Sequence, residues 1–429
     1  MNTKILTMSI IGVGGRGGEA YGRYIHGCTD KFKITHLCDI RKERLEKYGK
    51  AFDVAEENRF LCEDEFFEKK RSDVLLIGTM DRQHVAMAEK ALALGYDILL
   101  EKPISGDVDE LRRLVEKAKE AGRVVMVCHV LRYTVTMNKL KEILDEGGIG
   151  RLISVDQIEN VVFWHEAHSF VRGNWRNSDE SSPMILQKCC HDLDLLQYFV
   201  GARCHSVASM GSLAYFKREN KPKGAADRCT QCSYIESCKY SAKRIYIDMW
   251  KEYGSPDNAW PMNAVTDAYP LTEAAIYEAI HTNPYGRCVF ACDNNVVDNQ
   301  TTIMQFENGV TATLRMEAFT KKGGRDIRFF GTEGELSLDE VGETITLKRY
   351  FEEEKTWKLR DLTDDLAGHG GGDHRMLDKL YEALTQQNSK VNTSIENSVE
   401  SHYMALAAEE SRVKGGQLVL LDKYRNKEE

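Results

Sequence analysis

The chain has 429 residues, of which 42% are hydrophobic and 29% are charged. This composition is sufficient to bury large apolar cores, and it excludes an intrinsically disordered protein. The formal net charge is −9 and there is no long basic run, which argues against a nucleic-acid partner because such binding needs clustered Lys and Arg. At roughly 150 residues per domain, the length predicts two domains with a cleft between them.

The apolar segment at 5–15 (ILTMSIIGVGG) is too short to span a bilayer and lacks a signal-peptide cleavage pattern. We therefore expect a buried strand there, and a cytoplasmic protein without a membrane partner. Twelve cysteines are present. In a cytosolic chain, those outside apolar stretches suit metal binding better than disulfides. The seven within or beside apolar stretches, expected to be inert, are Cys28, Cys38, Cys62, Cys128, Cys189, Cys190 and Cys204.

The first strand runs directly into a glycine-rich turn that fits G-x-G-x-x-G, and a second strand, KITHLCDI, ends near Asp39. In this dinucleotide-binding fingerprint the glycines permit a tight turn, close approach to the pyrophosphate and close packing of the next helix. Asp39 would accept hydrogen bonds from the ribose hydroxyls, which favours NAD, whereas Arg41 keeps NADP open. The loop residues predicted to bind the cofactor are Gly12, Gly14, Gly15, Arg16 and Gly17.

Apolar strands and amphipathic helices continue to alternate up to residue 130, with further strands at 73–79, 97–103 and 123–130. This pattern predicts a Rossmann-type domain at 1–130, a doubly wound parallel sheet covered on both faces. Ligands bind beyond the carboxyl ends of such strands. The strand ends predict further cofactor contacts at Thr79, Asp81, His84, Glu101 and Lys102.

Residues 131–429 have the pattern of an α+β domain for substrate binding and oligomerisation. A linking helix is predicted at 134–146 and a strand at 151–163. Strand-rich segments at 301–319 and 325–351 are broken by turns, and two closing helices are expected at 372–387 and 396–414. An antiparallel sheet with one uncovered face favours a homo-oligomer, either a dimer or a tetramer.

The most informative segment of this domain is 181–201, SSPMILQKCCHDLDLLQYFVG. Gln187, His191 and Asp194 fall near one side of the predicted helix, which Pro183 would begin. A histidine with a nearby carboxylate is a reasonable acid/base unit beside a nicotinamide. The buried stripe predicted by helical spacing is Leu186, Cys189, Leu193, Leu196 and Val200.

Polar side chains cluster upstream, in the non-periodic stretch 163–177 (FWHEAHSFVRGNWRN). Aromatic faces and hydrogen-bonding groups together suit a polyhydroxylated ligand; the alternative is a surface loop with incidental charges. The glycine-rich run at 369–374 would also let backbone approach a ligand, or would simply form a flexible helix start. The candidates for substrate binding are His165, His168, Ser169, Arg172, Asn174, Trp175 and Arg176, with His129, Arg132 and Tyr133 at the domain junction.

A cysteine-rich insertion is expected at about 215–290, where periodicity is weak and turn residues are frequent. Cys229, Cys232 and Cys238 would supply three thiolates to a structural Zn²⁺, and Cys288 or Cys292 the fourth, of which we favour Cys288. Such a metal would explain how a long excursion stays folded. The alternative is a redox switch or a set of free thiols.

The order GVGGRG, CDIR, GTMDRQH and LLEKP, followed by a helix with His and Asp, resembles the Gfo/Idh/MocA (glucose-fructose oxidoreductase / inositol dehydrogenase) family. The resemblance covers essentially the whole chain and implies a second domain with a large, open, mostly antiparallel sheet. It implies that Lys102 is catalytic and that the Lys102–Pro103 bond is cis. Inositol dehydrogenases have an Asp four residues before the histidine; here Gln187 cannot exchange a proton, and Lys188 or Asp194 would have to replace it.

These patterns predict an NAD-dependent oxidoreductase acting on a secondary hydroxyl of a sugar, glycoside or cyclitol. Lys102 would hold the incipient alkoxide and His191 would take the hydroxyl proton, with Gln187 and Lys188 in the substrate-binding set. The alternative is an NAD-dependent glycosidase that oxidises C3 transiently, eliminates the C1 substituent and re-reduces the ring. A non-enzymatic NAD(P)-sensing regulator is the third hypothesis.

Overall fold

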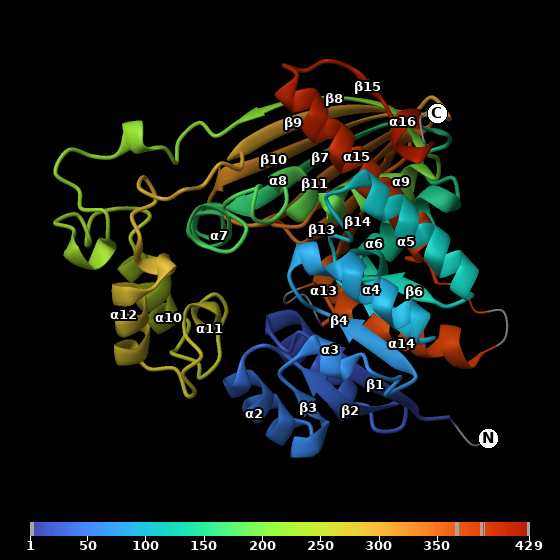
Figure 1. Ribbon diagram of the computed structural model, residues 1–429. Coiled ribbons are helices and arrows are strands. Elements are labelled where there is room, and N and C mark those ends of the chain that lie inside the picture. The colour runs from blue at the N-terminus through green and yellow to red at the C-terminus, as the bar shows by residue number, and fades with distance from the viewer. Residues whose placement is uncertain (1–3, 365–368, 387–388, 390, 427–429) are drawn as a thin grey trace.

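The computed structural model describes residues 4–364, 369–386, 389 and 391–426, which form two sheets (Figure 1). The first sheet has six parallel strands in the order β3-β2-β1-β4-β5-β6. Its strands are β1 (Leu6–Ile11), β2 (Phe32–Cys38), β3 (Arg59–Phe60), β4 (Val74–Ile77), β5 (Asp97–Leu100) and β6 (Val125–Val127). This order reverses between β1 and β4, the point at which doubly wound sheets bind dinucleotides.

Helices connect these strands and cover the sheet, as the alternating pattern predicted. The connecting elements are η1 (Gly15–Gly22), α1 (Arg23–Gly27), α2 (Lys42–Ala51), η2 (Glu56–Asn58), α3 (Glu63–Phe66), η3 (Asp81–Gln83), α4 (His84–Ala93) and α5 (Val108–Ala121). The glycine-rich turn between β1 and η1 leaves no space for a side chain at Gly12 or Gly17. Gly12 has a φ of +85°, and a Cβ on Gly17 would lie 2.1 Å from the carbonyl oxygen of Gly12. The fingerprint glycines are therefore required by the backbone itself.

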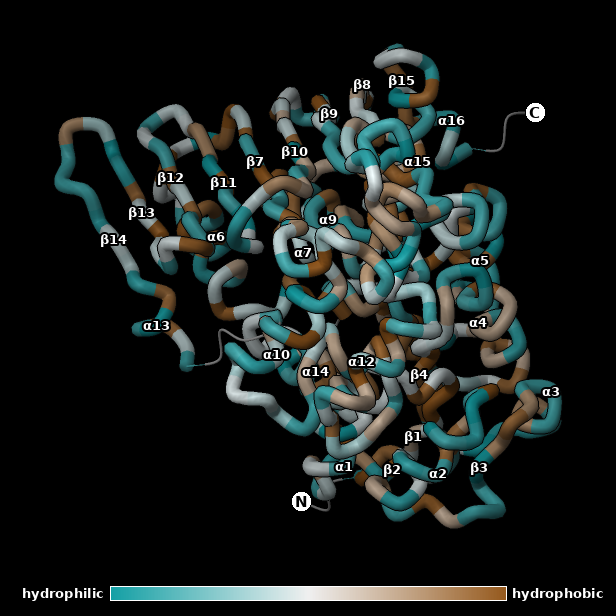
Figure 2. Tube along the Cα trace, turned by 90° about the vertical axis from the view of Figure 1, so that its left-hand side faces the viewer, coloured by the Kyte–Doolittle hydropathy of each residue, from teal (hydrophilic) through white to brown (hydrophobic). Residues whose placement is uncertain are grey.

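The second sheet has nine strands in the order β14-β13-β12-β11-β7-β10-β9-β8-β15, visible from left to right in Figure 2. Only β7 and β10 pair in parallel, so the sheet is mostly antiparallel, as predicted. The strands are β7 (Leu152–Val162), β8 (Cys204–Ser212), β9 (Asn299–Phe306), β10 (Thr311–Thr320), β11 (Gly324–Gly331), β12 (Gly334–Asp339), β13 (Thr344–Arg349), β14 (Lys355–Lys358) and β15 (Val419–Leu420).

One face of this sheet is covered and the other is left open within the chain. In β9 the buried residues alternate with exposed ones, among them Ile303 at 56% exposure. Helices α9 and α15 pack together, and α15 packs on β8. The helical elements of this part are η4 (Val130–Tyr133), α6 (Val135–Asp145), α7 (Phe163–His165), η5 (Glu166–Arg172), α8 (Met184–Gln187), α9 (Cys190–Val200), α13 (Leu359–Leu362), α14 (Gly372–Thr385), α15 (Ile395–Val413) and α16 (Asp422–Arg425).

Helix α14 returns to the nucleotide-binding sheet although it lies near the end of the chain. Its buried residues Met376, Leu377 and Leu380 share a core with Met8 and Ile10 of β1. No helix in the described ranges is long and apolar enough to cross a membrane.

The insertion between β8 and β9 forms a lobe beside the end of the large sheet (Figure 1). It has an apolar core of its own, which includes Phe216, Tyr246, Trp250 and Ile276 and continues into Val171 of η5. Its elements are η6 (Arg218–Asn220), η7 (Cys229–Gln231), η8 (Arg244–Asp248), α10 (Met249–Glu252), α11 (Met262–Val265), α12 (Glu273–Thr282) and η9 (Pro284–Gly286).

Candidate active site

The carboxylate predicted to bind ribose lies beside the glycine loop. Asp39 Oδ2 accepts a hydrogen bond from the backbone N–H of Val13 (2.9 Å), and Oδ1 accepts one from that of Arg41 (2.9 Å). These bonds fix the carboxylate at the end of β2 with lone pairs left for ligand hydroxyls. The Arg41 side chain forms an ion pair with Asp267 of the insertion. The loop, its glycines and Asp39 therefore fit a dinucleotide.

Arg16 and Glu101, both predicted as cofactor contacts, form one charged network. Arg16 Nε donates to Glu101 Oε1 (2.8 Å), Arg16 also pairs with Asp373 at the start of α14 (2.5 Å), and the Tyr21 hydroxyl donates to Glu101 (2.7 Å). Although burial opposes ionisation, the charges of Arg16 and Lys102 hold the pKa of Glu101 below its ordinary value. Glu101 is thus an anion that supports the loop and the neighbouring lysine.

Residues that follow β4 make hydrogen bonds to the backbone near Lys102 and to the segment before α8. The two ring nitrogens of His84 lie 2.7 Å from the carbonyl oxygen of Pro103 and 3.2 Å from that of Thr79. Asp81 accepts from the Ser182 hydroxyl (3.0 Å) and, more weakly, from the indole N–H of Trp175 (3.4 Å). His84 therefore braces the Lys102–Pro103 turn, while Asp81 joins the first domain to the segment before α8.

Lys102 stands immediately beyond β5, where it is half-buried, and the Lys102–Pro103 bond is cis, as the resemblance implied. Its ammonium Nζ donates a hydrogen bond to the backbone carbonyl of Gln187, at the end of α8 (3.1 Å). The last carbonyls of a helix lack partners within the helix, so this end is a natural acceptor for a cation. The lysine is thereby placed against the element that leads to His191.

The segment 181–201 forms two helices rather than the single helix predicted. The helix is interrupted at Lys188 and Cys189, which lie between α8 and α9. The Lys188 ammonium forms an ion pair with Glu159 of β7 (2.7 Å). The predicted apolar stripe is confirmed, since its members are at most 8% exposed. The break lies between Gln187 and His191, and it moves them out of simple helical register.

His191 is 7% exposed and its ring contacts two further histidines. The ring centroids lie 5.7 Å from His129 and 6.0 Å from His369. Burial, with the positive charge of Lys102 next in size, holds the pKa of His191 well below its ordinary value. Nδ1 of His191 has no hydrogen-bond partner among the described residues. The imidazole is therefore neutral at physiological pH and able to accept a proton.

Asp194 and Arg132, at the domain junction, are engaged with one another. The Arg132 guanidinium donates two hydrogen bonds, of 2.6 and 2.8 Å, to the Asp194 carboxylate, and both side chains are buried. The Tyr133 hydroxyl lies 3.0 Å from that of Thr393. Asp194 is thus held by an arginine rather than free to replace the acid absent at Gln187.

A buried charge network that the sequence analysis missed surrounds Lys188. Arg325 of β11 contacts Glu159 (3.0 Å) and Asp192 of α9 (2.8 Å), while Lys188 binds the other oxygen of Glu159. Burial favours the neutral amine of Lys188, but Glu159 raises its pKa above the ordinary value. Buried and more exposed residues alternate along β7 and β11, and Glu159 and Arg325 occupy buried positions of these strands. That alternation is the signal that would have identified them.

The polar stretch 163–177 serves two purposes. Burial, followed by the charges of Lys188, His168 and Lys102, holds the pKa of His165 well below its ordinary value. His168 stacks on Tyr285 with centroids 4.8 Å apart, and burial lowers its pKa to about 3. His168 is therefore part of the insertion's packing.

Two arginines of the same stretch anchor the insertion rather than face a ligand. Arg172, 1% exposed, donates to the carbonyls of Arg287 (2.7 Å) and Tyr240 (2.6 Å). Arg176 pairs with Asp293 (2.8 Å).

The predicted zinc site does not form. Among the residues that the structure describes, no three His, Cys, Asp or Glu side chains come together to hold a metal, and all twelve cysteines are free. The Cys229 sulfur accepts hydrogen bonds from the Ala242 backbone N–H (3.4 Å) and from Arg172 (3.6 Å). The insertion's own apolar core and the Arg172 anchor provide the stability that a metal was invoked to supply.

Two family models match the chain. Residues 6–129 match the model described as "Oxidoreductase family, NAD-binding Rossmann fold", and residues 141–420 match "Oxidoreductase family, C-terminal alpha/beta domain". The chain belongs to the Gfo/Idh/MocA oxidoreductase family. The first domain of this oxidoreductase is accordingly an NAD-binding Rossmann domain.

Individual relatives are distant. "Putative oxidoreductase YteT" of Bacillus subtilis is 25% identical over 86% of this oxidoreductase and 87% of its own length. "2,7-anhydro-N-acetylneuraminate hydratase" of Escherichia coli is 24% identical over 48% of this chain and 53% of its own length. The WlbA dehydrogenase of Bordetella pertussis, solved with NADH and UDP-GlcNAcA, shares the fold at a TM-score of 0.69, with 15% identity over 98% of this chain and 99% of its own.

Proposed function

We propose that this oxidoreductase interconverts a secondary hydroxyl and a ketone on a sugar, glycoside or cyclitol, with NAD as the cofactor. The observation that carries the proposal is that a lysine ammonium at the carboxyl edge of the nucleotide-binding sheet binds the end of α8, close to a buried histidine at the start of α9. Lys102 reaches the end of α8, and its charge lowers the pKa of His191 on α9. Names of relatives and neighbours, such as inositol 2-dehydrogenase and a dehydrogenase bound to UDP-GlcNAcA, support a carbohydrate substrate.

The two side chains have complementary roles in this proposal. When bound, NAD supplies the hydride acceptor. The Lys102 ammonium stabilises negative charge as it develops on the substrate oxygen. His191, kept neutral by burial and by Lys102, takes the hydroxyl proton, and in the reverse direction returns it. Gln187 contributes its backbone carbonyl, which orients Lys102, so the absence of an acid at this position does not remove the proton acceptor.

We infer a preference for NAD over NADP. A 2′-phosphate would meet the Asp39 carboxylate, and Arg41, the cation that would bind it, is paired with Asp267. The ratio of kcat/KM for NAD to that for NADP measures this preference. A ratio below one would refute it.

Lys102→Met and His191→Asn test the catalytic assignment. Each is expected to lower kcat by roughly 10²- to 10⁴-fold, while NADH still binds, as followed by its fluorescence. His205→Asn, on an exposed position of β8, is the matched control and should behave as the parent enzyme. If Lys102→Met retains full turnover on every carbohydrate that the parent oxidises, the proposal is wrong.

A second candidate is the redox-neutral glycosidase, which one buried acid favours. Glu166 of η5 is 1% exposed, and burial, reinforced by Asp298, raises its pKa well above the ordinary value. A protonated carboxyl within electrostatic reach of Lys188 is suited to protonate a leaving group. One relative is named "Glycosyl hydrolase family 109 protein 2" and is 28% identical over 34% of this chain. Release of p-nitrophenol from nitrophenyl glycosides without net NADH formation would identify this activity; net NADH formation would identify the dehydrogenase.

We further infer a cytoplasmic homo-oligomer that uses the open face of the nine-stranded sheet. Met210 and Ile303 point to this face and are 67% and 56% exposed. Light scattering on the parent and on Ile303→Lys tests the assembly, since a charge at the interface should dissociate it. A monomeric parent would refute the inference.

A further inference from the structure

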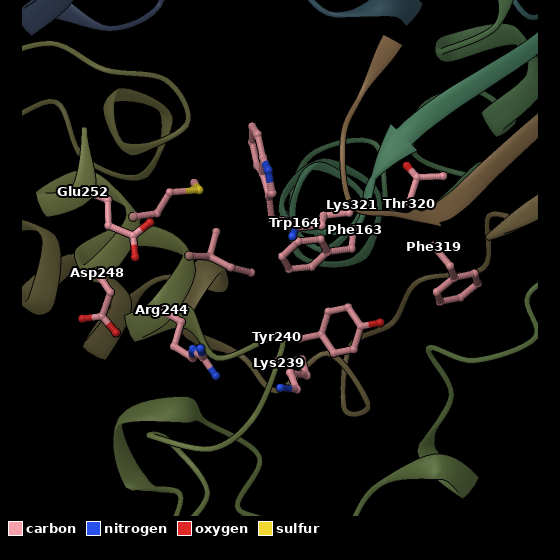
Figure 3. A pocket seen from close by; sticks show the side chains of 12 residues that line it. Phe163, Trp164, Lys239, Tyr240, Arg244, Asp248, Glu252, Phe319, Thr320 and Lys321 are labelled. Atoms are coloured by element: carbon pink, nitrogen blue, oxygen red, sulfur yellow. The ribbon is translucent and has the colours of Figure 1, made fainter. Parts of the chain in front are cut away.

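A pocket opens where the insertion meets the ends of β7 and β10 (Figure 3). Its volume is about 520 Å³, within the roughly 300–1,000 Å³ typical of small-molecule sites. One wall is Phe163 and Trp164 of α7, another comes from η8 and α10, and a third from the end of β10. The pocket therefore needs the insertion to exist.

Aromatic rings line this pocket and are held in place from behind. The ring of Phe163 lies 6.1 Å from that of Tyr240, and Phe216 supports both Tyr240 (5.0 Å) and Phe319 (5.7 Å). Phe319 is nevertheless 42% exposed. Rigid rings with free faces bind the apolar side of a sugar ring at little entropic cost.

The pocket also contains charges that the protein leaves unpaired. Lys239, Arg244 and Lys321 line it, and none forms an ion pair with another residue in the described part of the chain. Of the two acids, Asp248 is paired with Lys243 (3.2 Å), which leaves Glu252. Three free cations against one free carboxylate favour an anionic ligand, and Glu252 can accept from hydroxyls.

Trp164 connects this pocket to the catalytic residues. Its ring packs on that of His165, with centroids 6.0 Å apart, and on Trp260 of the insertion, 5.1 Å away. His165 in turn lies within electrostatic reach of Lys188 and Lys102. The pocket is thus lined by the residue that directly precedes His165 in the chain.

We propose that this pocket is a second carbohydrate subsite, which binds an acidic sugar unit, with a carboxylate on the ring, joined to the sugar that reacts at Lys102 and His191. The carboxylate meets Arg244 and the lysines, and the ring rests on the aromatic wall. The subsite makes the physiological substrate an acidic disaccharide or longer glycoside. The subsite rests on the proposed function only for the reaction at Lys102 and His191, since binding in the pocket is measurable without turnover.

Binding of glucuronic acid and of glucose to the NAD-loaded enzyme, followed by tryptophan fluorescence and calorimetry, tests the subsite. Glucuronic acid should bind at least 10-fold more tightly than glucose, because a charge-assisted hydrogen bond is the stronger one. Arg244→Gln should weaken glucuronic acid roughly 10-fold and Trp164→Ala should weaken both sugars. Lys251→Gln, beside the pocket on α10 but paired with Glu273 (2.8 Å), is the matched control and should bind as the parent does.

Three outcomes separate the possibilities. Equal affinity for the two sugars, or equal effects of Arg244→Gln and Lys251→Gln, overturns the subsite even if sugars are oxidised. Binding of glucuronic acid that depends on Arg244, with no sugar reducing NAD, supports the subsite and refutes the proposed function. Arg244 is exposed, so its variant should fold and keep the test valid if Trp164→Ala does not.

Discussion

The buried charge network around α9 allows a sharp stability prediction for Arg325→Met. Arg325 is the cation between two carboxylates, with contacts of 2.8 Å to Asp192 and 3.0 Å to Glu159. These acids are 0% and 2% exposed. After the substitution Glu159 keeps Lys188, at 2.7 Å, but Asp192 keeps only the side-chain amide of Gln157, at 2.6 Å. Asp192 becomes a buried acid without a cation in hydrogen-bond contact, and only the more distant charge of Lys188 still acts on it.

Removing one partner from a buried pair costs about 3–5 kcal/mol. At about 2.1 cal/mol/K of unfolding entropy per residue, a domain of about 300 residues then unfolds roughly 5–8 °C lower. The cost depends on pH. Burial raises the pKa of Asp192 to about 6 even with Arg325 present, and losing that cation raises the pKa further. Between these two pKa values the parent binds no proton at Asp192 and the variant does, so the destabilisation grows as pH rises above 6 and is smaller below it.

Thermal and urea unfolding at about pH 5.5 and about pH 8 measure both effects. Arg328→Met is the matched control on the same strand, because Arg328 is 58% exposed and pairs only with Glu335. An exposed pair contributes about 0–1 kcal/mol. The reasoning is refuted if the two variants lose the same stability, or if Arg325→Met loses more at the lower pH.

Three further predictions follow from the site. Turnover of the parent should stay level as pH falls through 6.5, because His191 is neutral there. In Lys102→Gln the residual rate should begin to fall at a higher pH than in the parent, since the lost charge raises the pKa of His191. Coincident pH–rate profiles of the two enzymes would contradict this. Arg172→Met removes the guanidinium donor of two half-buried carbonyls and should make 213–298 sensitive to limited proteolysis, unlike Arg218→Met at an exposed position. Equal cleavage patterns would count against the anchor. Prolonged dialysis against EDTA should leave the unfolding midpoint unchanged, and a lowered midpoint with released zinc would restore the metal site.

Local patterns were sufficient to predict the fold. The contact between Gly17 and the Gly12 carbonyl acts over five residues, and the alternation of strands and helices is set by burial of each element on one sheet. The cis Lys102–Pro103 bond followed from the resemblance alone. The packing of α14 on β1 was not predicted, because it joins segments more than 350 residues apart and no local signal reports such a return.

The site was predictable only as far as single residues. Lys102 and His191 were placed by strand ends and helical spacing, but the ion pair of Lys188 depends on Glu159 of another element. The pairing of Asp194 with Arg132 likewise depends on two segments meeting in space. Charged side chains pair with whichever opposite charges lie close to them in the folded structure. The spacing of residues within one segment does not indicate that proximity.

The insertion is held in place without a cluster of metal ligands among the described residues. Cysteine spacing suggested an independent unit stabilised by a metal, whereas Arg172 from the segment beside the catalytic centre anchors the insertion through Tyr240 and Arg287. Tyr240 is also a wall of the pocket. Arg172 thus ties the insertion, and with it the Tyr240 wall of the pocket, to η5, which directly follows His165 in the chain.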